Sequence, residues 1–143
     1  EDIPHSIAVD ESGNVYVTGH SRGNGTLLDY ATIKYDTDGL LQWVRRYNGT
    51  GNGNDRAKSI TADASGNVYV TGESDGVGTS IDYVTIKYST DGTEEWVNRF
   101  NGASNGNDLG YRIAVDTSGN VYATGSSSSG SVQENDFTTV KYN

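Results

Sequence analysis

A seven-residue segment that returns at a fixed spacing constrains this chain most. Gly-Asn-Val-Tyr-Val-Thr-Gly at 13–19 recurs unchanged at 66–72 and with one change at 119–125, a period of 53 residues. Aligned over that period, residues 2–54 and 55–107 are identical at 33 of 53 positions. Segments this similar adopt the same structure, so the chain is a tandem repeat. The predicted repeats span 1–54, 55–107 and 108–143, the third being incomplete.

Each repeat alternates apolar and polar residues with period two, and no window shows the spacing of a helix. The segment Asp-x-Ser-Gly-Asn is typical of a tight hairpin turn with glycine in the left-handed conformation. We therefore expect four strands in a complete repeat. They are predicted at 6–9, 14–18, 30–35 and 42–47 in the first repeat, at 59–62, 67–71, 83–88 and 95–100 in the second, and at 112–115, 120–124 and 137–142 in the third.

The pattern predicts an all-β fold whose sheets are covered on both sides. Val15 and Val17 point to one face of the second strand and Tyr16 to the other, so both faces carry apolar side chains. Stacking four-stranded antiparallel sheets around an axis covers both faces, and a repeat of this length is typical of β-propeller blades. A solenoid is the competing arrangement, although its repeats are usually shorter, about 20 to 45 residues.

Three motifs together resemble the bacterial SBBP β-propeller repeat family. They are Asp-x-Ser-Gly-Asn-Val-Tyr-Val-Thr-Gly, Asp-Tyr-x-Thr-Ile-Lys-Tyr and Trp-Val-x-Arg-Tyr/Phe-Asn-Gly, and they cover essentially the whole chain. The resemblance implies propeller blades, usually in longer exported or cell-surface proteins of bacteria or archaea, and no shared catalytic residues. The chain departs from a full set of such repeats because it holds only three, and the last stops before a fourth strand.

Charge and composition exclude several classes of function. The net charge is −9 and the ten Lys and Arg residues are scattered, which argues against binding to nucleic acid. There is no cysteine for a disulfide or a thiolate metal site. No apolar stretch approaches the roughly 20 residues that cross a bilayer, and the first four residues lack signal-peptide character. We expect no membrane insertion.

Acidic residues in the turns are the first candidates for a metal site. Oxygen ligands at this spacing could help to hold Ca²⁺, although the usual role of such an Asp is to hydrogen-bond its own turn. Asp36 is replaced by Ser89 in the second repeat, which favours the turn role. We therefore predict no cofactor, with calcium as the open alternative. The calcium candidates are Asp10, Asp63, Asp116, Asp38 and Asp91.

Aromatic residues of the fourth strand could stack on sugar rings or pack between blades. Because Trp43 and Trp96 recur at one strand position, as Tyr47 and Phe100 do, we favour packing. Arg46 and Arg99 are expected to lie across such rings or to pair with an acid.

A catalytic site would require residues that break the repeat. His5 aligns with Lys58 and Tyr111, and His20 with Glu73 and Ser126. Two unrepeated histidines without a motif-bearing Ser or a Cys form neither a triad nor a metal cage, so we predict surface positions and no enzyme activity.

Loops supply the remaining candidates. The segment 126–135, between the second and third strands of the last repeat, is one residue longer than its equivalents and is a place for specific binding. Asn24 and Asn48 fit the N-glycosylation pattern.

Uncovered end faces suggest a function. A stack of three blades exposes an apolar face at each end, and because the first repeat packs on the second as the second packs on the third, the two faces should be complementary. We predict a self-assembling structural scaffold, extracellular or on the cell surface, that forms a ring or a filament. A module that binds carbohydrate or protein is the alternative. The predicted assembly faces are Val15, Tyr16 and Ile33 with Val121, Tyr122 and Val140.

Overall fold

The computed structural model describes residues 1–130 and 135–143. Within these residues the regular secondary structure consists of β-strands alone. The strands form three antiparallel sheets in which consecutive strands are neighbours, so the predicted all-β fold with four-stranded blades is confirmed. We call the sheets blades 1, 2 and 3. Blade 1 is β1 (Asp2–Val9), β2 (Val15–Arg22), β3 (Leu28–Tyr35) and β4 (Leu41–Tyr47); blade 2 is β5 (Asp55–Ala62), β6 (Val68–Asp75), β7 (Ile81–Tyr88) and β8 (Glu94–Phe100); blade 3 is β9 (Asp108–Val115), β10 (Val121–Ser128) and β11 (Asn135–Tyr142).

The first two strands of each blade are joined by the predicted tight turn. Gly13, Gly66 and Gly119 have φ values of 86°, 77° and 82°, a conformation that glycine adopts without strain. In each turn the glycine N–H donates to the carbonyl of the preceding Asp. The repeated turn sequence therefore sets the same hairpin three times.

The first and second strands extend beyond the predicted limits. Strand β1 begins at Asp2 rather than near residue 6, and β2 continues through Gly19 to Arg22. A Cβ at Gly19 would lie 2.0 Å from the carbonyl oxygen of Ile3, so glycine is needed here because the two strands approach closely. The glycine that suggests the end of a strand instead permits its pairing with β1.

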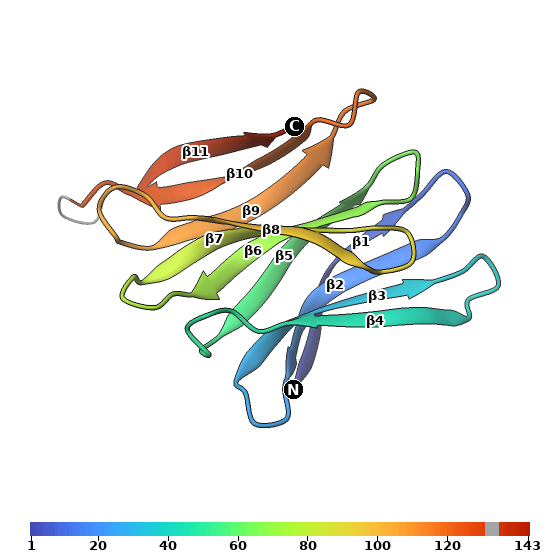
Figure 1. Cartoon of the computed structure of the whole chain (residues 1–143), viewed down its shortest axis with the longest axis horizontal. Coiled ribbons are helices and arrows are strands. Elements are labelled where there is room, and N and C mark those ends of the chain that lie inside the picture. Colours follow the sequence, from blue (N-terminus) through green and yellow to red (C-terminus); the bar gives the residue numbers. More distant parts are fainter. Residues whose placement is uncertain (131–134) are drawn as a thin grey trace.

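The three blades stack face to face, as successive layers from β1–β4 to β9–β11 (Figure 1). The hydrophobic core therefore lies between blades. Tyr16, Tyr30 and Trp43 of blade 1 pack against a cluster of blade 2. That cluster consists of Ala57, Ile60, Val68, Val70, Val84, Ile86 and Tyr88.

The first strands of neighbouring blades contact each other, β1 with β5 and β5 with β9. Each carries a residue that the register skips, namely His5, Lys58 and Tyr111. In the described part of the chain, no helix is long and apolar enough to cross a membrane.

Candidate functional site

Blade 1 inserts an aromatic side chain into a hollow of blade 2. Tyr30 is 1% exposed, and its hydroxyl donates to the carbonyl oxygen of Val84 at 3.3 Å. The hollow exists because Gly72 has no side chain: a Cβ there would lie 2.9 Å from the Tyr30 hydroxyl. We call this arrangement, a tyrosine of one blade seated over a glycine of the next, the knob contact.

Blades 2 and 3 make the same knob contact with Tyr83, which is fully buried. A Cβ at Gly125 would lie 2.8 Å from its ring, and one at Gly110 would lie 3.1 Å from it. The Tyr83 hydroxyl differs from that of Tyr30 because it finds no hydrogen-bond partner within the described residues. Burial raises the pKa of Tyr83, so the hydroxyl stays neutral.

The tryptophans also serve blade packing. Trp43 is 7% exposed, its ring centroid lies 6.1 Å from those of Tyr16 and Tyr88, and its Nε1 donates to the carbonyl oxygen of Thr90 at 3.2 Å. Trp96 is half-buried, and its ring centroid lies 5.3 Å from that of Tyr142. A buried ring offers no face to a sugar, so this geometry supports packing over the carbohydrate platform.

Tyr47 and Phe100, the other two aromatic candidates, contact the knobs. Their rings lie edge-on to Tyr30 and Tyr83, with centroid separations of 5.5 and 6.2 Å. They therefore support the knobs from the fourth strand of the same blade.

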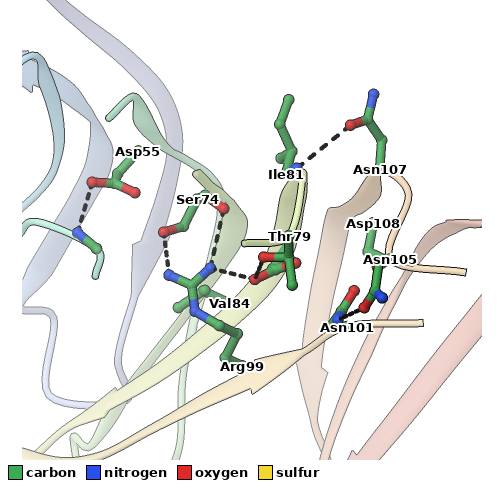
Figure 2. A network of polar contacts seen from close by, with 12 residues as sticks. Asp55, Ser74, Thr79, Ile81, Val84, Arg99, Asn101, Asn105, Asn107 and Asp108 are labelled. Carbon is green, nitrogen blue, oxygen red and sulfur yellow. Dashed lines mark hydrogen bonds and ion pairs between the residues drawn. The ribbon is translucent and has the colours of Figure 1, made fainter. Parts of the chain in front are cut away.

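A polar network fixes the fourth strand of blade 2 to its neighbours, and Figure 2 shows Arg99 reaching Ser74 within it. Arg99 forms an ion pair of 2.7 Å with Asp82, whose side chain is only 2% exposed. In blade 1 the corresponding pair, Arg46 and Asp29, is 3.6 Å apart, with the Arg46 side chain 44% exposed. Both arginines thus pair with an acid, one of the two roles expected for them.

The segments that link the blades are held by a buried aspartate. Oδ2 of Asp55 accepts the N–H of Gly49 at 2.7 Å (Figure 2), and Asp108 accepts that of Gly102 in the same way. Burial raises the pKa of Asp55 in spite of hydrogen bonds from Ser74 and Gly49, which act to lower it. Sequence reasoning did not single out these residues, although an Asp repeats at the start of every first strand.

The two glycosylation candidates differ in their surroundings. Asn48 Nδ2 donates to Oδ1 of Asn52 at 2.6 Å inside the linker between blades 1 and 2. Asn24 is exposed in the turn before β3, next to Gly25 with φ of 86°. A glycan on Asn48 would compete with a hydrogen bond that holds the linker, whereas Asn24 is open.

The acidic turn residues use their oxygens within the turns. Asp63 accepts hydrogen bonds from the N–H groups of Ser65 and Asn67, the Asn67 amide and the Tyr69 hydroxyl. Burial acts to raise the pKa of Asp63, but these hydrogen bonds outweigh it and the pKa falls below its usual value. Asp10 and Asp116 have the same four partners from their own turns.

In the turn between the third and fourth strands of a blade, the acidic residues also form hydrogen bonds within the turn. A hydrogen bond from Ser89 leads the causes that lower the pKa of Asp91 to about 2. Asp38 is exposed, and its N–H donates to Asp36 at 3.0 Å. Nowhere in residues 1–130 and 135–143 do three or more His, Asp or Glu residues form a group that could hold a metal ion. The hydrogen bonds give the acidic residues a role within their turns, and chelation tests the calcium alternative.

The residues that break the repeat form cross-strand pairs that sequence reasoning missed, and the surface position predicted for His20 is wrong, because its side chain is buried. His5 Nε2 and His20 Nδ1 lie 2.9 Å apart, Lys58 lies 3.3 Å from Glu73, and Ser126 and Tyr111 are joined by a hydrogen bond of 3.3 Å. In each pair the first-strand residue is the one that the register skips, and such bulges re-aim side chains. The repeat alignment shows that these six positions differ between repeats, but only the bulges in the structure show that the two side chains of each pair contact each other.

The outer face of blade 1, turned away from blade 2, contains an open hollow of about 350 Å³. Ile7 and Val9 on this face are 66% and 61% exposed, whereas Ile60, the equivalent of Ile7 in blade 2, is 6% exposed. The hollow thus corresponds to the one that receives Tyr30 in blade 2. Its lining includes Val17, Gly19, Ala31, Ile33, Val44 and Arg46.

The outer face of blade 3 presents a matching aromatic residue. Phe137 occupies the position of Tyr30 and Tyr83 and is 100% exposed. Tyr122, at the position of the buried Tyr16, is 37% exposed. The two ends of the stack therefore carry an empty hollow and an uncovered knob.

These placements correct the predicted assembly faces. Val15 and Ile33 lie on the outer face of blade 1 and Tyr122 on that of blade 3, but Tyr16 is fully buried against blade 2. Val121 is 2% exposed, because its face of blade 3 packs on blade 2, and Val140 lies on that same face. The prediction mixed both faces of a strand whose side chains alternate. Of the candidate binding loop 126–135, residues 131–134 lie outside the described residues.

Comparison with known proteins identifies one family. The model of the SBBP β-propeller repeat matches residues 1–25, 42–78 and 95–131, more than half of the chain. The search of curated proteins found no match to the chain.

Proposed function

Because the chain belongs to the SBBP β-propeller repeat family, we propose that it is a non-enzymatic structural scaffold that assembles with itself through its end blades. One observation carries this proposal. The outer face of blade 1 exposes the apolar positions that blade 2 buries, with Ile7 66% exposed against 6% for Ile60. An uncovered apolar sheet face is stabilised by a partner that removes it from water.

The assembly would be head to tail, because the two exposed faces are different surfaces. A contact of this kind closes into a ring when the rotation between copies divides a full turn, and otherwise grows into a filament. Two copies would bring six blades together, within the four to eight of known propellers. Strand β11 lies at the edge of its sheet, and edge pairing with another chain is the alternative route to a filament.

Sedimentation velocity over a range of micromolar protein concentrations tests self-assembly. A scaffold gives a concentration-dependent increase in mass, ending at a two-copy species for a ring or continuing for a filament. A chain that stays monomeric across the range contradicts the proposal.

We propose that the scaffold works outside the cell or on the cell surface of a bacterium or archaeon, as the resemblance to exported members of the family implies. Surface accessibility of the protein on intact source cells, against lysed cells, tests this placement. The absence of enzyme activity is also part of the proposal. It is supported by the pairing of His5 with His20, since the two imidazoles share a hydrogen bond.

A binding module is the second candidate, supported by the cross-strand pairs at the bulges. Bulges are over-represented beside functional sites, where they re-aim a side chain. The bulge residues His5, Lys58 and Tyr111 differ between the repeats, and their strands contact one another, β1 with β5 and β5 with β9. A glycan array probed with the wild type and with Tyr111→Ala tests the carbohydrate version. Binding that the variant loses supports it, and a blank array removes it.

A further inference from the structure

We propose that the hollow on the outer face of blade 1 is a docking site for Phe137 of a second copy of this chain. The inference rests on the proposed self-assembly and adds to it the residues, the polarity and the register of the contact. It extends the knob contact that the chain makes twice internally, with Tyr30 and with Tyr83, to a third place between copies.

The lining of the hollow matches the surroundings of Tyr30 in blade 2. Gly19 corresponds to Gly72, where a Cβ would lie 2.9 Å from the Tyr30 hydroxyl. Val17, Ala31 and Ile33 correspond to Val70, Val84 and Ile86, all fully buried in the core around Tyr30. The empty site in blade 1 therefore has the shape-determining glycine and the apolar walls of the filled one.

Phe137 has the position of a knob in the strand register. It lies opposite Ser126 on the neighbouring strand, as Tyr30 lies opposite His20 and Tyr83 lies opposite Glu73. Tyr30 and Tyr83 are 1% and 0% exposed in their hollows, whereas the Phe137 side chain is fully exposed. An exposed aromatic at this position is the expected anchor of an interface.

Two polar contacts of the internal interface can be repeated beside the knob. Lys34 donates to the carbonyl oxygen of Thr90 at 2.9 Å, and the equivalents at the chain ends are Lys141 and Thr37.

The second contact uses the tyrosine hydroxyl of the neighbouring position. Tyr16 donates to the carbonyl oxygen of Gly66 at 3.3 Å, with Tyr122 and Gly13 as the equivalents. These pairs orient blade 3 of one copy on blade 1 of the next as blade 1 lies on blade 2. The polarity is therefore head to tail.

One internal contact has no counterpart. The ring of Trp43 lies on Tyr88, but in the described residues blade 3 has three strands and lacks the strand that bears this tryptophan. The described residues therefore supply the knob and the two polar contacts for the docked interface, and this ring contact is not part of the proposal.

Two variants test the proposal by sedimentation velocity. Phe137→Ala removes a fully exposed side chain, and Ala31→Glu places a carboxylate in the hollow opposite Arg46 in the register, where it can pair with that guanidinium. Each should raise the dissociation constant roughly 30-fold or more, as loss of an interface anchor does. The matched control is Val77→Glu, at a 72% exposed position in the loop between β6 and β7, which should associate as the wild type does. Far-ultraviolet circular dichroism verifies the fold of each variant.

Mixing the two variants provides the decisive arm. Phe137→Ala keeps an intact hollow and Ala31→Glu keeps an intact knob, so an equimolar mixture should form two-copy complexes and nothing larger, although each variant alone is monomeric. Wild type that never associates contradicts self-assembly itself. Wild type that associates while Phe137→Ala associates equally well overturns the docking site alone and points to pairing at the edge of β11.

Discussion

The hydroxyl of Tyr30 in blade 1 donates a hydrogen bond of 3.3 Å to the backbone oxygen of Val84 in blade 2. Its counterpart Tyr83 is equally buried at the next interface, yet its hydroxyl lacks a partner within the described part of the chain. The repeats thus copy the apolar part of the knob contact and differ in its polar part. This difference makes the two tyrosines a matched pair for measuring what each part contributes.

Replacing these tyrosines by phenylalanine should have unequal effects on stability. Tyr30→Phe removes one of two hydroxyl donors to the Val84 oxygen, the other being Thr71 at 3.2 Å, and we expect the free energy of unfolding to fall by about 1 kcal/mol. Tyr83→Phe removes a buried hydroxyl that is not hydrogen-bonded, so we expect no loss or a small gain. Urea unfolding of both variants at one protein concentration measures the difference. Equal losses would show that Tyr83 has a partner in solution.

The two arginine pairs should also be unequal. Arg99→Met leaves the Asp82 carboxylate, 2% exposed, without its 2.7 Å ion pair, and removal of one partner from a buried pair costs about 3–5 kcal/mol. Arg46→Met should cost less, because that side chain is 44% exposed and its pair with Asp29 is longer, at 3.6 Å. Urea midpoints of the two variants decide the order. A larger loss for Arg46→Met contradicts this account.

The sequence was sufficient for the strands and their order, because period-two alternation and the Asp-x-Ser-Gly-Asn turn act locally. It was insufficient for the faces. Tyr16 and Val15 are neighbours in sequence, but one is buried by blade 2 and the other lies on an outer face, and only the stacking order decides which. Gly19 misled for a related reason: its role depends on the close approach of Ile3, a contact between strands.

The cross-strand histidine pair escaped prediction in the same way. A bulge at residue 5 turns His5 towards His20, and nothing in a single strand reports the register of the next. The buried Asp55 shows the converse case, since its repetition was visible but its role as acceptor for the Gly49 N–H requires the linker conformation.

The histidine pair should make stability depend on pH. Burial is the main cause that lowers the pKa of His5, followed by the charge of Lys58, and burial also leads for His20, followed by His5. Arg56 acts in the same direction on both, while Glu73 raises the pKa of His5 and Glu1 that of His20. Because the folded pKa values lie below the ordinary value of about 6.5, the unfolded chain binds more protons, and stability falls as the pH drops through this window.

Urea unfolding between about pH 7.5 and pH 5 measures this dependence, above the range in which most carboxylates titrate. The double variant His5→Gln, His20→Gln should lose most of the slope. A variant with the wild-type slope would assign the dependence to other groups.

Chelation distinguishes the two possible roles of the acidic turn residues, which are hydrogen bonding within the turn and calcium binding. If Asp63 serves its turn, EDTA leaves the melting temperature of the wild type unchanged and added Ca²⁺ does not raise it. Asp63→Ala should then lower the free energy of unfolding by about 1–3 kcal/mol, because the buried Tyr69 hydroxyl and two backbone N–H groups lose their acceptor. Asp116→Ala should cost less, since Tyr122 is exposed. A clear fall in melting temperature with EDTA would instead indicate bound calcium.

The docking proposal predicts that one substitution, Phe137→Tyr, strengthens the association between copies. Phe137 is the only one of the three knob positions in this chain that is not tyrosine, and Tyr30 donates to the backbone oxygen of Val84. The equivalent oxygen in the hollow belongs to Ala31, so Phe137→Tyr adds a donor opposite an acceptor that is already present. If the docked register copies the interface of blades 1 and 2, the hydrogen bond contributes about 1 kcal/mol, a roughly fivefold lower dissociation constant between copies.

If the docked register copies the interface of blades 2 and 3, where the Tyr83 hydroxyl lacks a partner among the described residues, association weakens instead. Sedimentation velocity of Phe137→Tyr beside the wild type distinguishes the two registers, and an unchanged constant would place residue 137 outside the contact.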